Sequence, residues 1–272
     1  MTVLQSILLG VIQGLTEFLP ISSSGHLVIV PYFLGWHIPA TDAFIFDVLL
    51  QVATLVAVIV YFWKDLIAIT KAMLLSLKNK SPMKTQQARL GWNLILATIP
   101  AGIIGLLLKE TVENTFANPK LTAWALFLTA ILLIIAERGG KRDRNLEQLD
   151  WKDVLWIGFS QVLAIFPGVS RSGATIAGGM TRDLGRPTAA RFSFLMSIPI
   201  MLVAGLSATY DLIRSPYVFQ LLPTFIPGFI SAAVVGYLTI RWLLRFLVSH
   251  PLYIFAVYCS VMGLLVIVSS YL

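Results

Sequence analysis

Long runs of apolar residues, separated by short charged segments, recur along the whole chain. Crossing the hydrocarbon core of a bilayer takes about 20 apolar residues in a helix. Six runs are long enough, or nearly so, and they cover residues 44–63, 92–108, 121–136, 192–209, 223–240 and 252–272. The chain is therefore predicted to be an all-α integral membrane protein with six transmembrane helices, and residues 1–272 are predicted to form a single membrane domain.

The composition agrees with lipid as the main solvent of this chain. With 57% apolar and only 12% charged residues, the protein could not expose its apolar surface to water and stay soluble. The net charge of +7 suggests nucleic acid at first sight, but the Lys and Arg lie in the loops, where topology signals and anionic lipid explain them. Nucleic acid is not an expected partner. The single cysteine, Cys259, excludes an intrachain disulfide and a cysteine-based metal cluster.

Two further apolar regions, residues 3–35 and 154–180, are interrupted near the middle by Pro, Gly, Ser and charged residues. Neither half of either region is long enough to span a bilayer comfortably. Backbone that leaves a helix at membrane depth is tolerated where it is buried in protein or lines a cavity. Each region is therefore predicted to be a re-entrant helix–loop–helix hairpin that enters the membrane and turns back.

The distribution of Lys and Arg predicts the orientation in the membrane. Sixteen of the twenty lie in the loops 64–91, 137–153, 181–191 and 241–251. Because cytoplasmic loops carry the excess of positive charge, these four loops are predicted to be cytoplasmic. Both termini then lie outside, the hairpin 3–35 re-enters from the outer face, and the hairpin 154–180 re-enters from the cytoplasmic face.

The two hairpins resemble each other at a constant offset of 148 residues. Seven of the sixteen positions from 10 to 25 are identical in the second copy, namely Gly10, Gln13, Leu15, Phe18, Ser22, Ser24 and Gly25 with Gly158, Gln161, Leu163, Phe166, Ser170, Ser172 and Gly173. We expect an internal duplication in which repeat one (1–136) and repeat two (154–272) are joined by the cytoplasmic loop 137–153. Three spans separate the hairpins, so the second copy is predicted to be inverted, as in many secondary transporters.

The first hairpin holds the candidate reactive groups. Gln13 and Glu17 lie four residues apart on one helical face, where they can share a proton, a water or a divalent cation. A carboxylate at membrane depth is costly and marks a functional site, whereas near the outer interface Glu17 would only hydrate the hairpin. Ser22, Ser23, Ser24 and Gly25 form a turn, and Ser22 is expected to bind substrate together with Gln13, although such serines also suit helix capping. His26 lies three residues after Ser23, close enough to serve as its base or as the nucleophile itself.

The second hairpin is predicted to bind an anion. Its glycines free the backbone N–H groups, a short helix adds its positive end, and Arg171 offers a planar fork for phosphate oxygens. The residues predicted to complete this cradle are Gly168, Ser170, Ser172, Gly173 and Thr175. Arg171 could instead pair with Glu17 as a structural ion pair, and both can hold if substrate displaces the pair. At the offset of 148, Arg171 corresponds to Ser23. The first hairpin would therefore supply the acid, base and nucleophile, and the second would neutralise the charge on the transferred phosphoryl group.

These motifs together resemble a known family. Gln13-x-x-x-Glu17, then Pro-Ile-Ser-Ser-Ser-Gly-His26, and later Pro167-Gly-x-Ser-Arg-Ser-x-x-Thr175 are similar to the motifs of undecaprenyl pyrophosphate phosphatases of the bacitracin-resistance type. The resemblance covers essentially the whole chain. It implies hydrolysis of the lipid carrier's pyrophosphate to the monophosphate and inorganic phosphate, at a site open to the outer face of the bacterial cytoplasmic membrane, which recycles the carrier for cell-wall synthesis.

The same resemblance implies a cofactor and partners. Mg²⁺ or Ca²⁺ is expected near Gln13 and Glu17, although a glutamine at position 13 weakens any arrangement that needs two anionic ligands. Asp47 is a further candidate that could equally lie at the membrane interface. The expected partners are a polyprenyl pyrophosphate substrate and membrane lipid, and a homodimer is one option for the assembly.

Several alternatives stay open on the sequence alone. Ser23, His26 or a water activated by Glu17 could attack the phosphorus. Inverted repeats with broken segments also suit a transporter or flippase for an anionic polyprenyl lipid. A lipid-binding scaffold without activity is a third option, but it does not explain why Glu, Ser, His and Arg gather at membrane depth.

Overall fold

All regular elements that the computed structural model describes, in residues 1–38, 40–108, 118–213 and 218–271, are helices. The long ones are α1 (Val3–Thr16), α2 (Ser23–Phe33), α3 (Ala40–Tyr61), α4 (Trp63–Lys78), α5 (Gln86–Leu107), α7 (Pro119–Arg138), α8 (Trp151–Val162), α9 (Arg171–Met180), α10 (Arg186–Ile213), α11 (Val218–Ser249) and α12 (Tyr253–Ser269). Two short 3₁₀ segments are η1 (Leu146–Gln148) and η2 (Leu163–Ile165). The predicted all-α class is confirmed.

Three described helical stretches are long and apolar enough to cross a membrane, in agreement with the prediction of a membrane protein. They are Gln86–Leu107, Pro119–Arg138 and Leu222–Ser249. Three of the predicted spans, 92–108, 121–136 and 223–240, fall on these helices. α1 and α12 are apolar but shorter. Parts of the predicted outer loops 109–120 and 210–222 lie outside the described residues.

The region 64–91, expected to be a loop, holds a helix instead. α3 ends at Tyr61, and the chain bends by 80° into α4. Lys64, Lys71 and Lys78 recur every seven residues along α4, so the charges line one side while leucine and isoleucine occupy the others. The charges that suggested a loop therefore form the polar side of an amphipathic helix.

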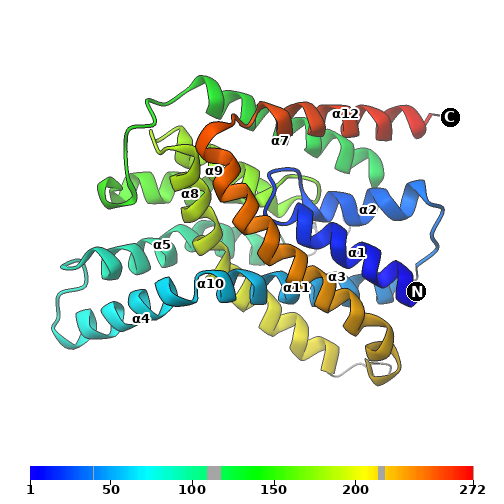
Figure 1. Cartoon of the computed structure of the whole chain (residues 1–272), viewed down its shortest axis with the longest axis horizontal. Helices are drawn as coiled ribbons and strands as arrows, with labels where there is room; N and C mark the ends of the chain where they lie inside the picture. The colour runs from blue at the N-terminus through cyan, green and yellow to red at the C-terminus, as the bar shows by residue number, and fades with distance from the viewer. Residues whose placement is uncertain (39, 109–117, 214–217, 272) are drawn as a thin grey trace.

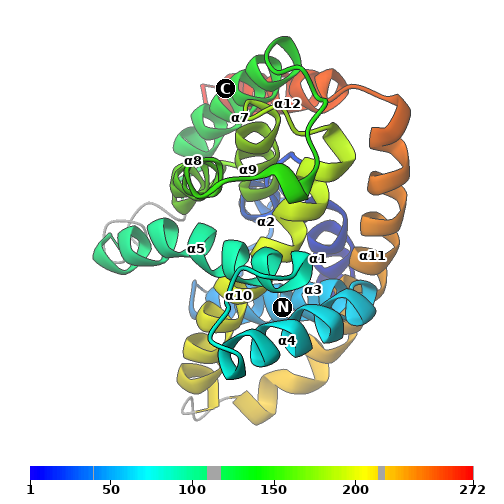
Figure 2. The same ribbon diagram turned by 90° about the vertical axis from the view of Figure 1, so that its left-hand side faces the viewer.

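Both termini lie at one end of the long axis of the molecule and the α4–α5 connection lies at the other, while α10 and α11 run obliquely to this axis (Figure 1). α1 packs on α11, α5 on α8, α7 on α12, and α3 on α10. Seen after a 90° turn about the vertical axis, α7 and α12 lie at the top, α3 and α4 lie below, and α11 runs along one edge (Figure 2). The basic loop 137–153 and the connection between α4 and α5 thus share the end opposite the termini.

Each interrupted region folds as two helices joined by a turn. Thr2 and Asp150 cap α1 and α8, and Ser22 and Ser170 cap α2 and α9. Both pairs of caps keep the sequence offset of 148 residues. The local signals that start a helix are thus placed alike in the two hairpins.

The two hairpins also pack alike. A Cβ added to Gly10 of α1 would lie 2.2 Å from the carbonyl oxygen of Gly228 on α11. A Cβ added to Gly158 of α8 would lie 2.5 Å from the carbonyl oxygen of Ala97 on α5. Only glycine permits such close helix contacts, which replace the hydrophobic effect as the source of helix association in lipid.

Two buried carboxylates, each bound by two arginines, tie the helices together at the end opposite the termini. Asp153, at the start of α8, accepts from Arg144 Nη2 and from Arg182 Nε, both at 2.6 Å. Burial raises the pKa of the Asp153 carboxyl, but hydrogen bonds from Arg144, the Asp150 backbone N–H and Arg182 outweigh burial and hold the pKa below its usual range. Asp153 is therefore ionised and joins α8 to the segments before and after it.

Glu137, in the last turn of α7, is the second such carboxylate. It accepts from Arg186 Nη2 at 2.6 Å, from Arg142 Nη2 at 2.9 Å and from the Leu252 backbone N–H at 2.7 Å. The end of α7 is thereby held against the first residue of α10 and the cap of α12. These contacts fix the ends of helices that frame the interior.

We expect Asp153→Asn to lower the free energy of unfolding by about 3 kcal/mol, because two arginines lose the charge that compensates them. A carboxyl with a lowered pKa stabilises the fold above its unfolded pKa of about 4, and this stabilisation is lost as pH falls through the folded pKa. The gap between wild type and variant should therefore shrink on acidification. Thermal unfolding in detergent micelles measures this difference in stability.

Asp143→Asn, at an exposed position just before α8, is the control. Equal effects of the two changes would refute the role of Asp153.

Candidate active site

The turns of the two hairpins meet at a pocket of about 240 Å³. One wall comes from the turn between α1 and α2, another from the turn between η2 and α9, and the rest from α3 and α10. The polar side chains that line it are Glu17, Ser22, Ser23, Ser24, Gln51, Ser170 and Arg171. Ile165, Val169, Ile200 and Met201 are among its apolar lining. The pocket thus joins a polar floor to apolar walls.

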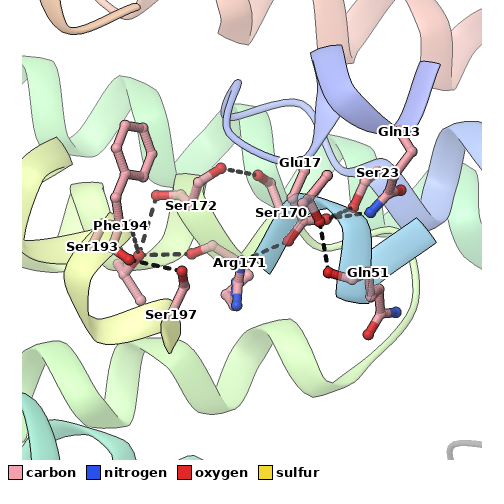
Figure 3. A network of polar contacts seen from close by, with 12 residues as sticks. Gln13, Glu17, Ser23, Gln51, Ser170, Arg171, Ser172, Ser193, Phe194 and Ser197 are labelled. Carbon is pink, nitrogen blue, oxygen red and sulfur yellow. Dashed lines mark hydrogen bonds and ion pairs between the residues drawn. The ribbon is translucent and has the colours of Figure 1, made fainter. Parts of the chain in front are cut away.

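Glu17 is the centre of the polar floor (Figure 3). Its Oε2 accepts the Ser23 hydroxyl at 2.6 Å and the Gln13 amide at 2.9 Å, and its Oε1 accepts from Arg171 Nη2 at 2.5 Å. The residue is only 9% exposed. An ionised carboxylate in such a place requires a compensating charge, which Arg171 supplies. Glu17 is also positioned to accept the proton of Ser23.

Two helix N-termini converge on the pocket. α2 begins at Ser23 and α9 begins at Arg171. Free N–H groups and the positive end of the helix dipole favour an anion at such a terminus. Together with the guanidinium of Arg171, the two termini make the pocket suited to a phosphate group.

Side chains of the second half of the chain satisfy the backbone of the first turn. The Leu19 carbonyl accepts the Ser172 hydroxyl at 3.1 Å, and the Pro20 carbonyl accepts the Cys259 thiol at 3.7 Å. Both donors are buried. These two carbonyls therefore have partners within the protein where the chain leaves the helix.

The reverse holds for the second turn. The Gly168 N–H donates to the Ser24 hydroxyl at 3.3 Å, and the Ser170 N–H donates to the Thr129 hydroxyl at 3.0 Å. Both acceptors belong to the first half of the chain. Gly168 has φ of 94°, a conformation that favours glycine, and its Cα lies against Thr122 and Ala125 of α7. Each turn therefore depends on the other half of the molecule.

Among the described residues, the ring of His26 makes no hydrogen bond with the Ser23 hydroxyl, for which it was predicted as a possible base. Its Nδ1 binds the Ser22 carbonyl at 2.6 Å, and its Nε2 binds the Tyr258 hydroxyl at 2.7 Å. In the first turn of α2, the ring folds back onto the cap residue instead of along the helix. The hydrogen-bond partner of Ser23 is Glu17.

Other predicted site residues lie behind the pocket. The Ser172 hydroxyl lies between Ser170 Oγ and the Leu19 carbonyl, and the Thr175 hydroxyl binds the Arg171 carbonyl and Ser193 Oγ. Gly168 and Gly173 contribute backbone N–H groups to the turn rather than to the pocket. These residues hold the cradle in place.

Asp47 does not line the pocket, whereas Gln51, one helical turn later on α3, does. Gln51 is not among the predicted site residues. Its polar side chain within a largely apolar predicted span is the feature that could have indicated it. The apolar lining residues Ile200 and Met201 carry no signal that separates them from the rest of α10.

The donors around Glu17 can accommodate a divalent cation only in part. Gln13 Oε1 is buried without a hydrogen-bond partner, which suits an oxygen ligand. Within the described ranges, no three His, Cys, Asp or Glu side chains gather as a metal site would require. Mg²⁺ is usually held by one or two carboxylates together with substrate phosphates. The residues thus fit a cation shared with a phosphate ligand, not a cage made by protein alone.

Fold and pocket together define an all-helical membrane protein with a polar pocket between the turns of two helix pairs. The chain matches the family described as bacitracin resistance protein BacA over residues 6–265. Similar proteins named undecaprenyl-diphosphatase occur in Chlorobium phaeovibrioides (42% identical, covering 98% of this chain and 96% of the relative), Moorella thermoacetica (42%, 98% and 97%) and Thermomicrobium roseum (40%, 98% and 98%). The chain belongs to the bacitracin resistance protein BacA family.

We expect Arg171→Ala to weaken the binding of inorganic pyrophosphate 10- to 100-fold, because hydrogen bonds to a charged group contribute about 1.5–3 kcal/mol. Isothermal titration of the purified protein measures the affinity. Arg245→Ala removes an exposed arginine of α11 and should leave it unchanged. Equal affinities of both variants and wild type would place the anion site elsewhere.

Proposed function

We propose that the protein is a membrane phosphatase that hydrolyses undecaprenyl pyrophosphate to undecaprenyl phosphate and inorganic phosphate. The observation that carries this proposal is the shared carboxylate, because Glu17 binds both the Ser23 hydroxyl and the Arg171 guanidinium at the floor of the pocket. A hydroxyl with a base and an adjacent cation is the arrangement that phosphoryl transfer needs. The relatives carry the name of this activity.

Substrate binding would first exchange the partner of Arg171. The pyrophosphate offers oxygens to the guanidinium and to the N-termini of α2 and α9, and the Arg171–Glu17 ion pair opens. Glu17 is then free to accept a proton. The apolar walls of the pocket, which include Ile165 and Ile200, suit the first part of a polyprenyl tail.

Chemistry would then proceed in two displacements. Glu17 takes the proton of Ser23 as Ser23 Oγ attacks the distal phosphorus, and the bond to the bridging oxygen breaks, so that undecaprenyl phosphate leaves. Water next attacks the phosphoserine, Ser23 Oγ leaves as the alkoxide and regains a proton, and inorganic phosphate is released. Arg171 neutralises the charge on the equatorial oxygens in both steps. Direct attack by water activated by Glu17 is the alternative.

A Mg²⁺ or Ca²⁺ ion would be held by Glu17 and Gln13 Oε1 together with phosphate oxygens. When bound, it would supply positive charge to the pyrophosphate. The orphaned amide oxygen of Gln13 supports this assignment.

The finer topology belongs to the same proposal. We take residues 1–136 and 154–272 as inverted repeats with re-entrant hairpins 3–35 and 154–180 and six spans in all, placed in the bacterial cytoplasmic membrane with the pocket open to the outer face. The equal offsets of the helix caps and the equivalent packing of Gly10 and Gly158 support the repeat. The separation of the termini from the basic loops supports the orientation.

Purified protein should release phosphate from undecaprenyl pyrophosphate, and Glu17→Ala and Arg171→Ala should each lower turnover by about 100- to 1,000-fold without loss of the fold. Phosphate release in detergent measures turnover, and thermal unfolding checks the fold. Arg245→Ala serves as the control. Wild-type turnover in both site variants would refute the site, whereas lipid transport in proteoliposomes without any hydrolysis would favour a flippase.

The stereochemistry at phosphorus decides which group attacks. With a substrate made chiral at the distal phosphorus, two displacements through Ser23 give net retention, and a single attack by water gives inversion. Ser23→Ala should lower turnover by roughly 1,000-fold or more, because it removes the nucleophile. Inversion together with an active Ser23→Ala variant would rule out the phosphoserine route.

A further inference from the structure

The turn before the proposed nucleophile is strained. Ser22, the cap of α2, has φ of 72° and ψ of 104°, a region that residues other than glycine rarely adopt. Such a conformation persists only where surrounding contacts over-determine it, and it is common at active sites. Ser23 follows directly, so the contacts that hold Ser22 also set the position of the Ser23 hydroxyl.

A two-step chain of hydrogen bonds holds this turn. The Ser22 carbonyl can only accept, so His26 Nδ1, at 2.6 Å, must carry the proton of that bond. In a neutral imidazole Nε2 is then an acceptor, and the Tyr258 hydroxyl, at 2.7 Å, donates to it. The two rings stack with centroids 5.6 Å apart and an interplanar angle of 12°. Both ring nitrogens of His26 are therefore engaged in a defined tautomer.

The last link of this chain comes from α12, which lies against α7. Tyr258 and its neighbour Cys259 both reach the first turn, since the Cys259 thiol donates to the Pro20 carbonyl. Neither His26 nor Tyr258 lines the pocket. α12 thus supports the turn directly at the Pro20 carbonyl and, through His26, at the Ser22 carbonyl.

We propose that Tyr258 is a positioning residue, which acts through His26 to hold the strained Ser22 turn and so places the Ser23 hydroxyl against Glu17. The inference rests on the proposed function, in which Ser23 Oγ reacts. His26 is accordingly a donor to a carbonyl, not a base or a nucleophile. Tyr258 is 232 residues away in sequence and belongs to neither motif.

Replacement of His26 separates these roles. The amide nitrogen of asparagine can take the place of Nδ1, so His26→Asn should keep kcat within about tenfold of wild type. His26→Ala removes the side-chain donor to the Ser22 carbonyl and leaves it only the weaker backbone N–H of residue 26, at 3.3 Å in the wild type. This variant should lose about 100-fold, as expected for a displacement of about 1 Å at a reacting group. A base or nucleophile cannot be replaced by an amide. A folded His26→Asn variant as inactive as His26→Ala would therefore overturn the proposal.

Replacement of Tyr258 tests the link to α12. Tyr258→Phe should lower kcat about tenfold with KM within twofold, whereas Tyr253→Phe, at a similarly exposed tyrosine of α12, should change neither. Because Tyr258 acts through His26, adding Tyr258→Phe to His26→Ala should cause no further loss. Additive losses, or an unchanged kcat in Tyr258→Phe, would contradict the proposal.

A measurement without activity tests the same contact. The ¹⁵N resonances of His26 in wild-type protein should show the tautomer protonated at Nδ1, and Tyr258→Phe should shift only the Nε2 resonance strongly. A ring protonated at Nε2 alone would overturn the inference. Absence of hydrolysis by wild-type protein would refute the proposed function instead. The tautomer of His26 would still show whether the hydrogen bonds to Ser22 and Tyr258 exist as described.

Discussion

Backbone that leaves a helix inside an apolar medium must find its hydrogen-bond partners within the protein, and this constraint organises the whole molecule. Each hairpin turn takes those partners from the other half of the chain. Ser172 and Cys259 supply donors to the first turn, and Ser24 and Thr129 supply acceptors to the second. The two turns are consequently built as one unit, and neither can form its site alone.

The Glu17–Arg171 pair extends the same dependence to charge. One member comes from each hairpin, and burying either charge without the other is unfavourable. The pair also brings Ser23 and Arg171, which occupy equivalent positions in the two hairpins, to a single carboxylate. Equivalent backbone positions thus serve different chemical roles, with a hydroxyl at one helix N-terminus and a cation at the other.

Much of this arrangement could be predicted from the sequence because its causes are local. The Ser-x-Ser-Gly motifs mark the caps at Ser22 and Ser170, the interrupted apolar runs mark the hairpins, and a buried carboxylate requires a cation. The hydrogen bond between His26 and Tyr258 could not be predicted, because Tyr258 lies in a distant apolar helix with no motif. The inward orientation of Ser172 and Thr175 depends likewise on contacts with Leu19 and Ser193. The charges of α4 by themselves predict a loop, and only the seven-residue spacing of Lys64, Lys71 and Lys78 indicates a helix.

The proposed mechanism depends on the exchange of Arg171 from Glu17 to the substrate. A structure determined with a non-hydrolysable bisphosphonate analogue of the lipid pyrophosphate tests it most directly. We predict that the distal phosphorus lies about 3–3.5 Å from Ser23 Oγ and that Arg171 binds the oxygens of this phosphorus. The ion pair between Arg171 and Glu17 should be open. An analogue bound elsewhere, with Arg171 still paired to Glu17, would contradict it.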